Sequence, residues 1–282
     1  MRSAALNSLE DELGDVLEKA LRQAGLDEGE AAKRAGIPES RLRDAIDYRS
    51  DLRWDELGRL AQVLGLNEVG LCALGSGHYP RPEIDALPFT VEVLAMSHGI
   101  GVVNAYLVSE NGSRSGILFD TGSGIAALGA VWPDAIIDLS AVFLTHVETE
   151  HAGALCAVMA RFGAAAAFIP EGAEAPCGQP APEGMHWQVG DLRVDVFSTP
   201  GHAAAHNSYL VRRSSALEER ALLIAGDMIF AGSAGGAYFC QRRLKANLRR
   251  VLEAVPRCTV IAPGHGPMTT VDNELRFNPF LA

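Results

Sequence analysis

The sequence contains few cysteines, and they follow no recognisable pattern. Five cysteines are scattered over 282 residues, and no two of them form a Cys-x-x-Cys pair. An odd number without this spacing argues against a disulfide framework and a cysteine zinc site, and it favours a reducing compartment. The five are Cys72, Cys156, Cys177, Cys240 and Cys258.

Long hydrophobic runs are also missing. Acidic residues occupy four of the positions 10–15, where a secretory signal peptide would need an apolar run. No apolar segment of the sequence approaches the length that spans a membrane. We therefore expect a cytoplasmic protein with no membrane partner.

An excess of positive charge is the third absence. The chain has 24 Lys+Arg and 35 Asp+Glu, which gives a formal net charge of -11. The protein as a whole is therefore not attracted to nucleic acid or to an anionic membrane. A hydrophobic fraction of 48% and a charged fraction of 21% are ordinary for a globular protein with a sizeable core.

Residues 1–76 are predicted to form a small helical domain. Apolar residues recur at helical spacing from Ala4 to Ala24 and from Trp54 to Leu64. Between these stretches, Gly36 can end one short helix and Pro38 can begin the next. Two short helices joined by such a turn make a helix-turn-helix. This block resembles the helix-turn-helix domain of the Cro/C1-type repressors.

That resemblance implies a possible DNA partner. The second helix, about Glu39 to Tyr48, would enter the major groove. Residues 1–80 nevertheless hold ten Lys+Arg and fifteen Asp+Glu, whereas DNA-binding modules carry a basic footprint. DNA binding through residues 28–50 is therefore a candidate that the charge disfavours. The alternative is a helical lid or dimerisation module, with a homodimer as a further hypothesis.

A second domain is expected over residues 77–282. The Gly- and Pro-rich stretch at 74–82 is typical of a linker, and the composition changes after it. Strand-like apolar runs then alternate with a few helical segments, which predicts an α/β architecture. The strand-like runs cover residues 89–94, 102–108, 116–120, 140–144, 165–169, 192–197, 207–211, 221–225 and 258–262. The helical segments cover residues 124–131, 152–162 and 241–255.

Side chains that can bind a metal are concentrated directly after one of these runs. Four of them fall within six residues, namely His146, Glu148, Glu150 and His151. We expect them on a loop at the end of a buried strand, where a scaffold holds them while one side stays open. Imidazole and carboxylate together suit zinc, iron or manganese.

Three more candidate ligands end strand-like runs in the second half of the chain. His202, Asp227 and His265 each follow an apolar run and a Gly- or Pro-containing turn. This recurrence is expected if several strand ends converge on one cavity.

Residues 85–282 resemble the metallo-β-lactamase superfamily. The motif Thr-His-x-His-x-Asp-His-x-Gly of that family stands here as residues 145–153, with Glu148 in place of the second His and Glu150 in place of the Asp. His202, Asp227 and His265 match the later ligand motifs, and residues 119–122 match a structural Asp turn. The stretches 226–233 and 264–280 are similar to the glyoxalase II (hydroxyacylglutathione hydrolase) branch.

The resemblance implies an αβ/βα sandwich with two divalent metal ions, zinc or iron, with manganese as a further candidate. His146, Glu148 and His202 would hold one ion, and Glu150, His151 and His265 the other. Asp227 would bridge the two. The oxygen donor at Glu148 favours harder ions such as iron or manganese. A partly degenerate cavity that binds one ion or none is the alternative.

The implied activity is hydrolysis of a small-molecule thioester or other activated acyl compound by a metal-bound hydroxide. Asp227 and Glu150 are the candidate catalytic residues. Two alternatives remain open: a diiron redox enzyme resembling the flavodiiron core, and a transcriptional regulator whose hydrolase-like domain senses a metabolite. His206 is expected to support the site without binding metal. The basic residues of 242–245 either bind an acidic substrate or form a solvated helix face.

Overall fold

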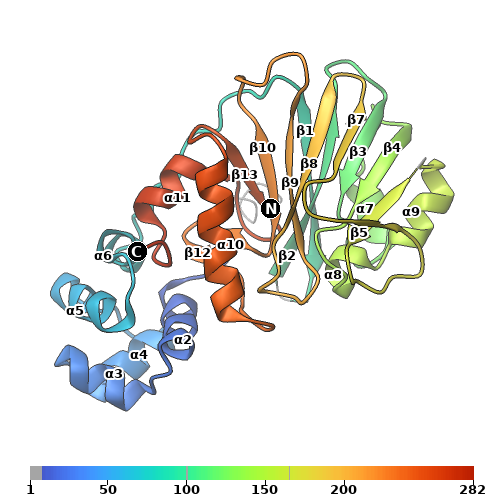
Figure 1. The fold of residues 1–282 in the computed structure, drawn as a ribbon. Helices are drawn as coiled ribbons and strands as arrows, with labels where there is room; N and C mark the ends of the chain where they lie inside the picture. The colour runs from blue at the N-terminus through green and yellow to red at the C-terminus, as the bar shows by residue number, and fades with distance from the viewer. Residues whose placement is uncertain (1–7, 100, 165) are drawn as a thin grey trace.

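The computed structural model describes residues 8–99, 101–164 and 166–282. In this part of the chain a helical segment precedes a sandwich of two β-sheets (Figure 1). The fold class predicted from the sequence, an α/β sandwich preceded by helices, is confirmed.

Short helices with clear stop signals make up the N-terminal segment. Gly25 ends the first described helix and Gly36 the second, each with φ of 64°, a conformation that glycine adopts without steric cost. Asp27 caps the second helix by accepting a hydrogen bond from the backbone N–H of Glu30. The helices are α2 (Leu13–Ala24), α3 (Glu28–Ala35), α4 (Glu39–Ile46), α5 (Trp54–Leu64) and α6 (Glu68–Gly75).

The first helix begins later than the sequence pattern predicts. The predicted helix spans 4–24, of which residues 4–7 lie outside the described chain, and α2 starts at Leu13. The Glu12 side chain accepts from the backbone N–H of Asp15, and the Asp15 carboxylate accepts from the N–H of Glu12. This reciprocal capping fixes the start of α2 and leaves residues 8–12 non-helical.

Two six-stranded sheets form the sandwich. The first has the order β1-β2-β3-β4-β5-β6, and the second β14-β13-β10-β9-β8-β7. The first consists of β1 (Thr90–His98), β2 (Gly101–Ser109), β3 (Ser115–Phe119), β4 (Asp138–Phe143), β5 (Ala167–Pro170) and β6 (Gln179–Ala181). The second consists of β7 (His186–Val189), β8 (Leu192–Ser198), β9 (Asn207–Arg213), β10 (Leu222–Gly226), β13 (Val260–Pro263) and β14 (Thr269–Thr270). A small hairpin pairs β11 (Ile229–Phe230) with β12 (Ser233–Ala234).

The central strands bury both faces, which explains their unbroken apolar runs. In β3, Ile117 and Phe119 belong to the core between the sheets, whereas Leu118 packs into the layer outside the first sheet. In β10, Ile224 faces the inner core and Leu223 the outer layer. Successive side chains of a strand point to opposite faces of its sheet. The two sheets therefore fill three apolar layers, one between the sheets and one outside each of them.

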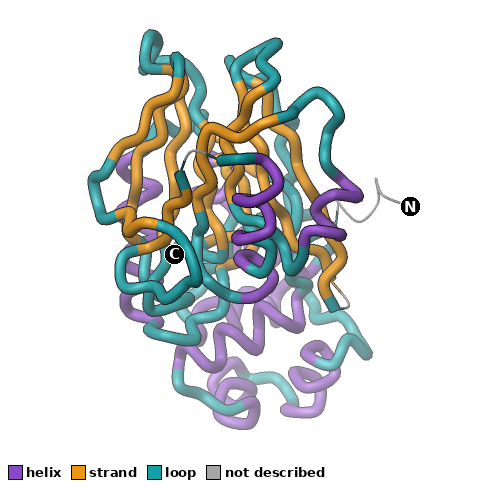
Figure 2. Tube along the Cα trace, turned by 90° about the vertical axis from the view of Figure 1, so that its right-hand side faces the viewer, coloured by secondary structure: helices purple, strands orange, loops and turns teal. Residues whose placement is uncertain are grey.

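Helices cover the two outer faces of the sandwich (Figures 1 and 2). They are α7 (Ile125–Val131), α8 (Thr149–Ala152), α9 (Leu155–Phe162), α10 (Gln241–Ala254) and α11 (Val271–Phe277). The predicted helix over 152–162 is wrong in one respect, because it is two helices. The backbone N–H of Ala154 donates to the carbonyl of Gly122 instead of continuing α8, so the chain turns before α9 begins.

The helical segment packs directly on the sandwich (Figure 2). One continuous apolar cluster joins Leu17 and Leu71 from the segment with Leu248 and other residues of α10. Tyr79, in the stretch predicted to be a linker, is only 7% exposed and donates a hydrogen bond to Glu274. Tyr79 itself is therefore packed into the fold, whereas residues 76–78 before it are exposed. No helix of the described residues has the length and apolar character needed to cross a membrane.

Candidate metal centre

The candidate ligands lie where strands of both sheets end. His146 follows β4 in the first sheet, while His202, Asp227 and His265 follow β8, β10 and β13 in the second. Strands β10 and β13 are parallel, and β8 runs in the same direction because β9 is antiparallel to both β8 and β10. Their carboxyl ends therefore meet at one edge. The structure brings together all seven residues that the sequence singles out.

The first group consists of His146, Glu148 and His202. The Glu148 carboxylate places one oxygen 3.3 Å from Nε2 of His202 and the other 3.9 Å from Nε2 of His146. Candidate ligand atoms of the three residues lie within 4.8 Å of one another. Both imidazoles are buried, whereas the Glu148 side chain is 42% exposed. The group is therefore open on the Glu148 side.

The second group consists of Glu150, His151 and His265, whose candidate ligand atoms also lie within 4.8 Å of one another. Glu150 and His151 stand on the short helix α8, which corrects the expectation that all four residues of the motif lie on a loop. The first turn after Glu148 closes because the N–H groups of His151 and Ala152 both donate to the Glu148 carbonyl.

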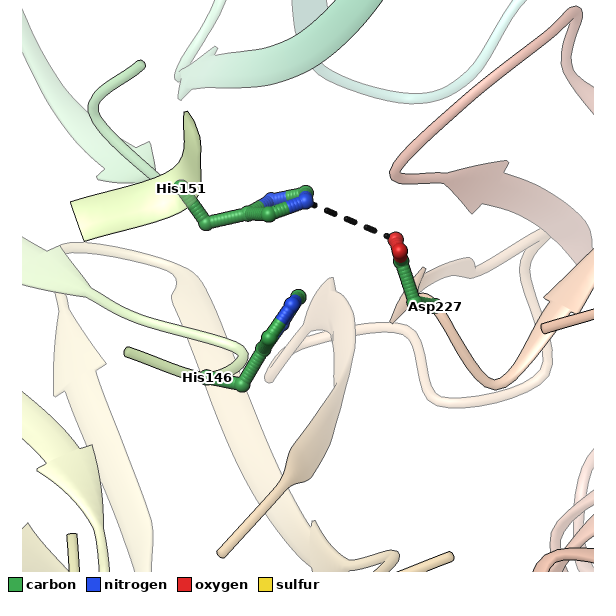
Figure 3. A group of neighbouring side chains, drawn as sticks. All are labelled: His146, His151 and Asp227. Carbon is green, nitrogen blue, oxygen red and sulfur yellow. Dashed lines mark ion pairs between the residues drawn. The ribbon is translucent and has the colours of Figure 1, made fainter. Parts of the chain in front are cut away.

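Asp227 lies between the two groups. Its Oδ1 is 3.6 Å from Nε2 of His151, and its Oδ2 is 3.7 Å from Nε2 of His202 and 3.4 Å from Nε2 of His265. Figure 3 shows the imidazoles of His146 and His151 and the Asp227 carboxylate directed toward a common centre. This is the place that the resemblance gives to a bridging ligand.

Hydrogen bonds on the outer side of the rings hold the imidazoles in place. Each of the four histidines engages a fixed group through Nδ1, so its Nε2 faces the centre. Such outer contacts set the tautomer and the orientation of metal-binding histidines. The partners are Thr145 Oγ1 for His146 (2.9 Å), Asp120 Oδ2 for His151 (3.0 Å), the Gly236 carbonyl for His202 (2.8 Å) and the Val102 carbonyl for His265 (2.8 Å).

Unpaired polar atoms at the centre fit a metal ion. Nε2 of His146, His151 and His202 and Oδ1 of Asp227 are buried and have no hydrogen-bond partner in the described structure. Burying such atoms without a partner is costly. Imidazole nitrogen and carboxylate oxygen are the donors that divalent zinc, iron or manganese accepts. The residues present therefore suit the ions that the sequence predicts.

Asp120 positions two parts of the site at once. Its carboxylate accepts hydrogen bonds from the backbone N–H of Thr145 at 2.7 Å and from the Thr145 hydroxyl at 2.8 Å, while Oδ2 contacts Nδ1 of His151. Asp120 has φ of 61°, in the left-handed region that non-glycine residues seldom adopt. The network of bonds at its carboxylate holds this conformation. The Asp turn noted in the sequence thus orients a candidate ligand without being one.

Charge inside the cluster shifts the pKa values in opposite directions. Burial and the neighbouring His151 lower the pKa of His146 well below its ordinary range. Burial works against ionisation of Asp227, but the charge of His151 and the hydrogen bond from His265 outweigh it, so its pKa is well below normal. Burial alone would lower the pKa of His265, and its bond to Asp227 instead raises it to about 9. Asp227 is therefore ionised at neutral pH.

His206 lies behind the cluster, as its expected supporting role requires. It contacts the Thr199 hydroxyl through Nδ1 at 2.8 Å, and its Nε2 accepts from the backbone N–H of Asp227 at 3.3 Å. Burial lowers its pKa to about 3, so the ring stays neutral. Because both ring nitrogens have partners, His206 holds the Asp227 backbone in place.

Two residues near the site carry no signal in the sequence. Nε2 of His98, at the end of β1, lies 3.4 Å from the Glu150 carboxylate. The carboxylate of Glu10, in the segment before α2, lies 3.9 Å from Nδ1 of His265. Both contacts join residues far apart in the chain, and no local sequence pattern predicts them.

Arginines within residues 28–50, the candidate DNA-binding stretch, are engaged in ion pairs. Arg41 contacts Glu56 at 2.7 Å, and Arg43 contacts Glu28 at 2.9 Å as well as Glu39. Arg49 pairs with two aspartates of its own helix region, Asp44 and Asp47. Helices α3 and α4 do meet at the predicted Gly36 turn. DNA binding stays a prediction, and these pairs add to the charge that disfavours it.

Comparisons with known proteins find relatives that match part of this chain. An uncharacterised protein of Aquifex aeolicus is 36% identical over 113 residues, which cover 37% of this chain and 50% of that protein. An atrochrysone carboxyl ACP thioesterase of Aspergillus fumigatus is 26% identical over 214 residues, 74% of this chain and 46% of its own length. The chain therefore matches about half of each relative.

The fold and the family profile agree with these relatives. The solved structure of TTHA1623 in a di-iron-bound form superposes with a TM-score of 0.52 at 27% identity, covering 66% of this chain and 99% of that one. The sequence profile of the family described as "Metallo-beta-lactamase superfamily" matches residues 98–265, which run from His98 beside Glu150 to the candidate ligand His265. The chain belongs to the metallo-β-lactamase superfamily.

Proposed function

We propose that this protein is a metal-dependent hydrolase of thioesters or similarly activated acyl compounds. The observation that carries the proposal is the pair of three-residue groups with Asp227 between them. Three imidazole Nε2 atoms and Oδ1 of Asp227 are buried there without a hydrogen-bond partner. His146, Glu148 and His202 would hold one ion, and Glu150, His151 and His265 the other. Asp227 would contact both.

The chain contributes orientation and charge to this chemistry. A pair of divalent ions supplies Lewis acidity, which polarises an acyl carbonyl and lowers the pKa of water. The outer hydrogen bonds keep every imidazole Nε2 aimed inward before substrate arrives. Ionised Asp227 places Oδ1 near His151 of the second group and Oδ2 near both His202 of the first group and His265 of the second. Glu150, which contacts His98, is placed to orient the nucleophile or to accept its proton.

Three likenesses support a thioester as the substrate. The Aspergillus fumigatus relative is named as an ACP thioesterase, and Emericella nidulans has a relative named as a thioesterase that is 31% identical over 170 residues. The stretches 226–233 and 264–280 resemble the glyoxalase II branch, whose substrate is also a thioester. A thioester is an activated acyl compound, so its carbonyl needs less assistance than an amide.

A diiron redox enzyme is the second candidate, and Glu148 is the observation that favours it. A carboxylate oxygen of Glu148 lies 3.3 Å from Nε2 of His202, and Glu148 supplies an oxygen donor where the family motif has imidazole. Oxygen donors favour harder ions such as iron, and the similar protein TTHA1623 was solved in a di-iron-bound form. Oxygen consumption by the iron-loaded protein with an added reductase tests this candidate.

Metal content and hydrolysis test the main proposal together. We expect about two iron, zinc or manganese ions per chain in untagged protein by plasma mass spectrometry, and turnover of a thioester panel by that protein. Asp227→Asn should lower turnover by at least about a hundredfold, because the shared ligand loses its charge. Full metal occupancy without turnover of any thioester or ester would overturn the hydrolase proposal.

The departure at Glu148 provides a sharper variant. Glu148→His restores the family motif, and we expect it to shift metal preference toward zinc while keeping two ions per chain. Glu148→Ala removes the donor and should lower occupancy to about one ion. Glu171→Ala, at an exposed position after β5, is the matched control for loss of a carboxylate. Equal metal content in all three variants would rule out Glu148 as a ligand.

A further inference from the structure

Helix α10 concentrates positive charge in an otherwise acidic protein. Between Asp227 and Glu253 the chain has no acidic residue and five basic ones, against a net charge of -11 for the whole protein. The apolar face of α10 is buried through Leu244, Leu248, Val251 and Leu252, so the exposed basic residues lie on its outer face. They are Arg242, Arg243, Lys245, Arg249 and Arg250.

The first turn of this helix stands directly beside the candidate metal centre. A side chain at Gly201 would overlap the backbone of Leu244 in α10. The backbone N–H of Cys240, the residue before α10, donates to the Gly201 carbonyl at 2.9 Å, and the next residue after Gly201 is the candidate ligand His202. The basic face therefore begins at the rim of the site.

Exposed aromatic rings stand between the basic face and the site. Tyr238 is 76% exposed, and its ring centroid lies 5.3 Å from that of His202. Phe239 is 48% exposed and lies under the guanidinium of Arg243, 5.6 Å from the ring centroid. Exposed aromatics with neighbouring arginines are characteristic of protein interfaces.

Three of the five basic side chains are available to a partner. Arg250 pairs with Glu183, and Arg249 donates to the carbonyl of Ala282. Within the described residues, Arg242, Arg243 and Lys245 form no ion pair with a carboxylate of this chain. Their charge is therefore not neutralised internally.

We propose that the α10 face, defined as Tyr238, Phe239, Arg242, Arg243 and Lys245, docks an acidic carrier protein that presents the acyl group to the metal centre as a thioester. This inference rests on the proposed hydrolase function. Complementary charge would steer the carrier to this face, because the remaining surface of a protein with net charge -11 repels it. The aromatic rings would anchor it beside His202.

The shape of the surface favours a protein over a free acyl nucleotide. The cavity beside the rim, between α2 and residues 235–241, has a volume of about 180 Å³, whereas small-molecule sites typically enclose about 300–1,000 Å³. The available cations stand on the convex outside of a helix and do not line this cavity. A partner that contacts these cations must therefore present an extended surface, as a protein does.

The test compares one acyl group on three leaving groups, using full-length metal-loaded enzyme. The substrates are an acidic acyl carrier protein loaded with octanoate, octanoyl coenzyme A, and the neutral octanoyl-N-acetylcysteamine. The variant is the double substitution Arg242→Glu and Lys245→Glu. Its matched control is Lys33→Glu with Arg34→Glu on α3, which changes the net charge equally on an exposed helix away from the site.

We expect kcat/KM for the carrier substrate to fall about tenfold or more in the α10 variant, mainly through KM, and to lose its salt dependence. The control variant and the neutral thioester should change by less than about twofold. An unchanged kcat/KM for the carrier substrate overturns the docking surface. An equal fall for coenzyme A and carrier substrates overturns the carrier and assigns the face to a small anionic leaving group.

Failure of the proposed hydrolase is recognised separately. If none of the three thioesters is hydrolysed, binding of the fluorescently labelled octanoyl carrier is measured by anisotropy at low salt. Binding that the α10 variant loses and the control keeps supports the surface even then. Absence of binding overturns it.

Discussion

Asp120 shows how much of this site depends on a residue that never contacts the metal position. Its carboxylate holds the Thr145 backbone and hydroxyl and contacts His151. It is 2% exposed, so its charge is stabilised by these bonds and not by water. Loss of that charge affects folding and ligand geometry together.

We therefore expect Asp120→Asn to lower the free energy of unfolding by about 2 kcal/mol, the range for hydrogen bonds to a charged group. Metal affinity should fall by about tenfold or more, because the His151 ring loses its fixed orientation. Chemical denaturation and metal titration measure the two effects. Asp138→Asn, at the exposed opposite end of β4, should leave both unchanged. Metal affinity unchanged in Asp120→Asn would contradict this role.

Glu56 sets a pH dependence away from the metal centre. The hydrogen bond from Arg41 holds the pKa of this buried carboxyl below its ordinary value of 4.5. A carboxyl whose pKa is lower in the folded chain adds stability above its unfolded pKa and loses it as the pH falls through the folded value.

Glu56→Gln should therefore be destabilised at pH 7 by on the order of 1 kcal/mol. The difference from the unaltered protein should shrink as the pH drops below 4.5. Urea denaturation at pH 7, 5 and 4 measures it in metal-free protein, which keeps the histidine ligands out of the comparison. A difference in unfolding free energy that grows toward acid pH would contradict the lowered pKa of Glu56.

At the scale of elements, two glycines permit close approaches between distant parts of the chain. A side chain at Gly264, just after β13, would overlap the Asp227 carboxylate. A side chain at Gly70 of α6 would overlap the Phe277 carbonyl at the end of α11. Glycine is required at both positions because a β-carbon would push apart a ligand in one case and the helical segment in the other.

A pair of facing thiols forms a second contact between distant elements. Cys156 on α9 and Cys177 before β6 place their sulfur atoms 3.0 Å apart. Burial and the contact with Cys156 raise the pKa of Cys177 to about 11, so Cys177 remains protonated at neutral pH. Cys156 is the more exposed of the two thiols and therefore the more accessible to an oxidant.

We expect oxidised glutathione to convert this pair to a disulfide, with both electrons passing to glutathione, which is released as two thiols. Closing a loop of about 20 residues should stabilise the fold by about 3 kcal/mol at most. Peptide mapping without reductant and thermal unfolding detect the bond. Cys156→Ser should abolish it, whereas Cys258→Ser should not. Thiols that remain free under oxidation would show that the pair cannot close.

At the scale of the whole molecule, charge and packing tie the helical segment to the sandwich. The segment shares one apolar cluster with α10 and α11, and Asn67 bonds to the carbonyls of Arg276 and Pro279. Glu10 reaches the neighbourhood of His265 from the same segment. The helices thus form part of the surroundings of the candidate metal centre.

The same charge distribution predicts the outcome of a DNA-binding test. We expect no shift of random-sequence or genomic DNA fragments in gels at 150 mM salt and at most a weak, salt-sensitive shift near 20 mM, because few uncompensated cations face a phosphate backbone. A sequence-specific complex stable at about 150 mM salt would contradict this and favour the regulator hypothesis.

The sequence alone determined those features that depend on local pattern. Apolar runs of five to seven residues predicted most central strands, because strands buried on both faces must be apolar throughout. Gly36 and Pro38 marked a helix boundary because glycine adopts a positive φ without steric cost, whereas proline fixes φ and lacks a backbone N–H. The motif at residues 145–153 identified the ligand candidates because metal-binding side chains so close together are seldom coincidental.

Only the tertiary structure decided which residues meet outside the ligand motifs. His98 reaches Glu150, Glu10 approaches His265, and Cys156 faces Cys177 across strand crossovers and turns that no local periodicity encodes. It also decided that Arg41 and its neighbours are paired. Such contacts depend on the packing of distant elements, whose free energy is shared among many side chains, so no single stretch of sequence specifies them.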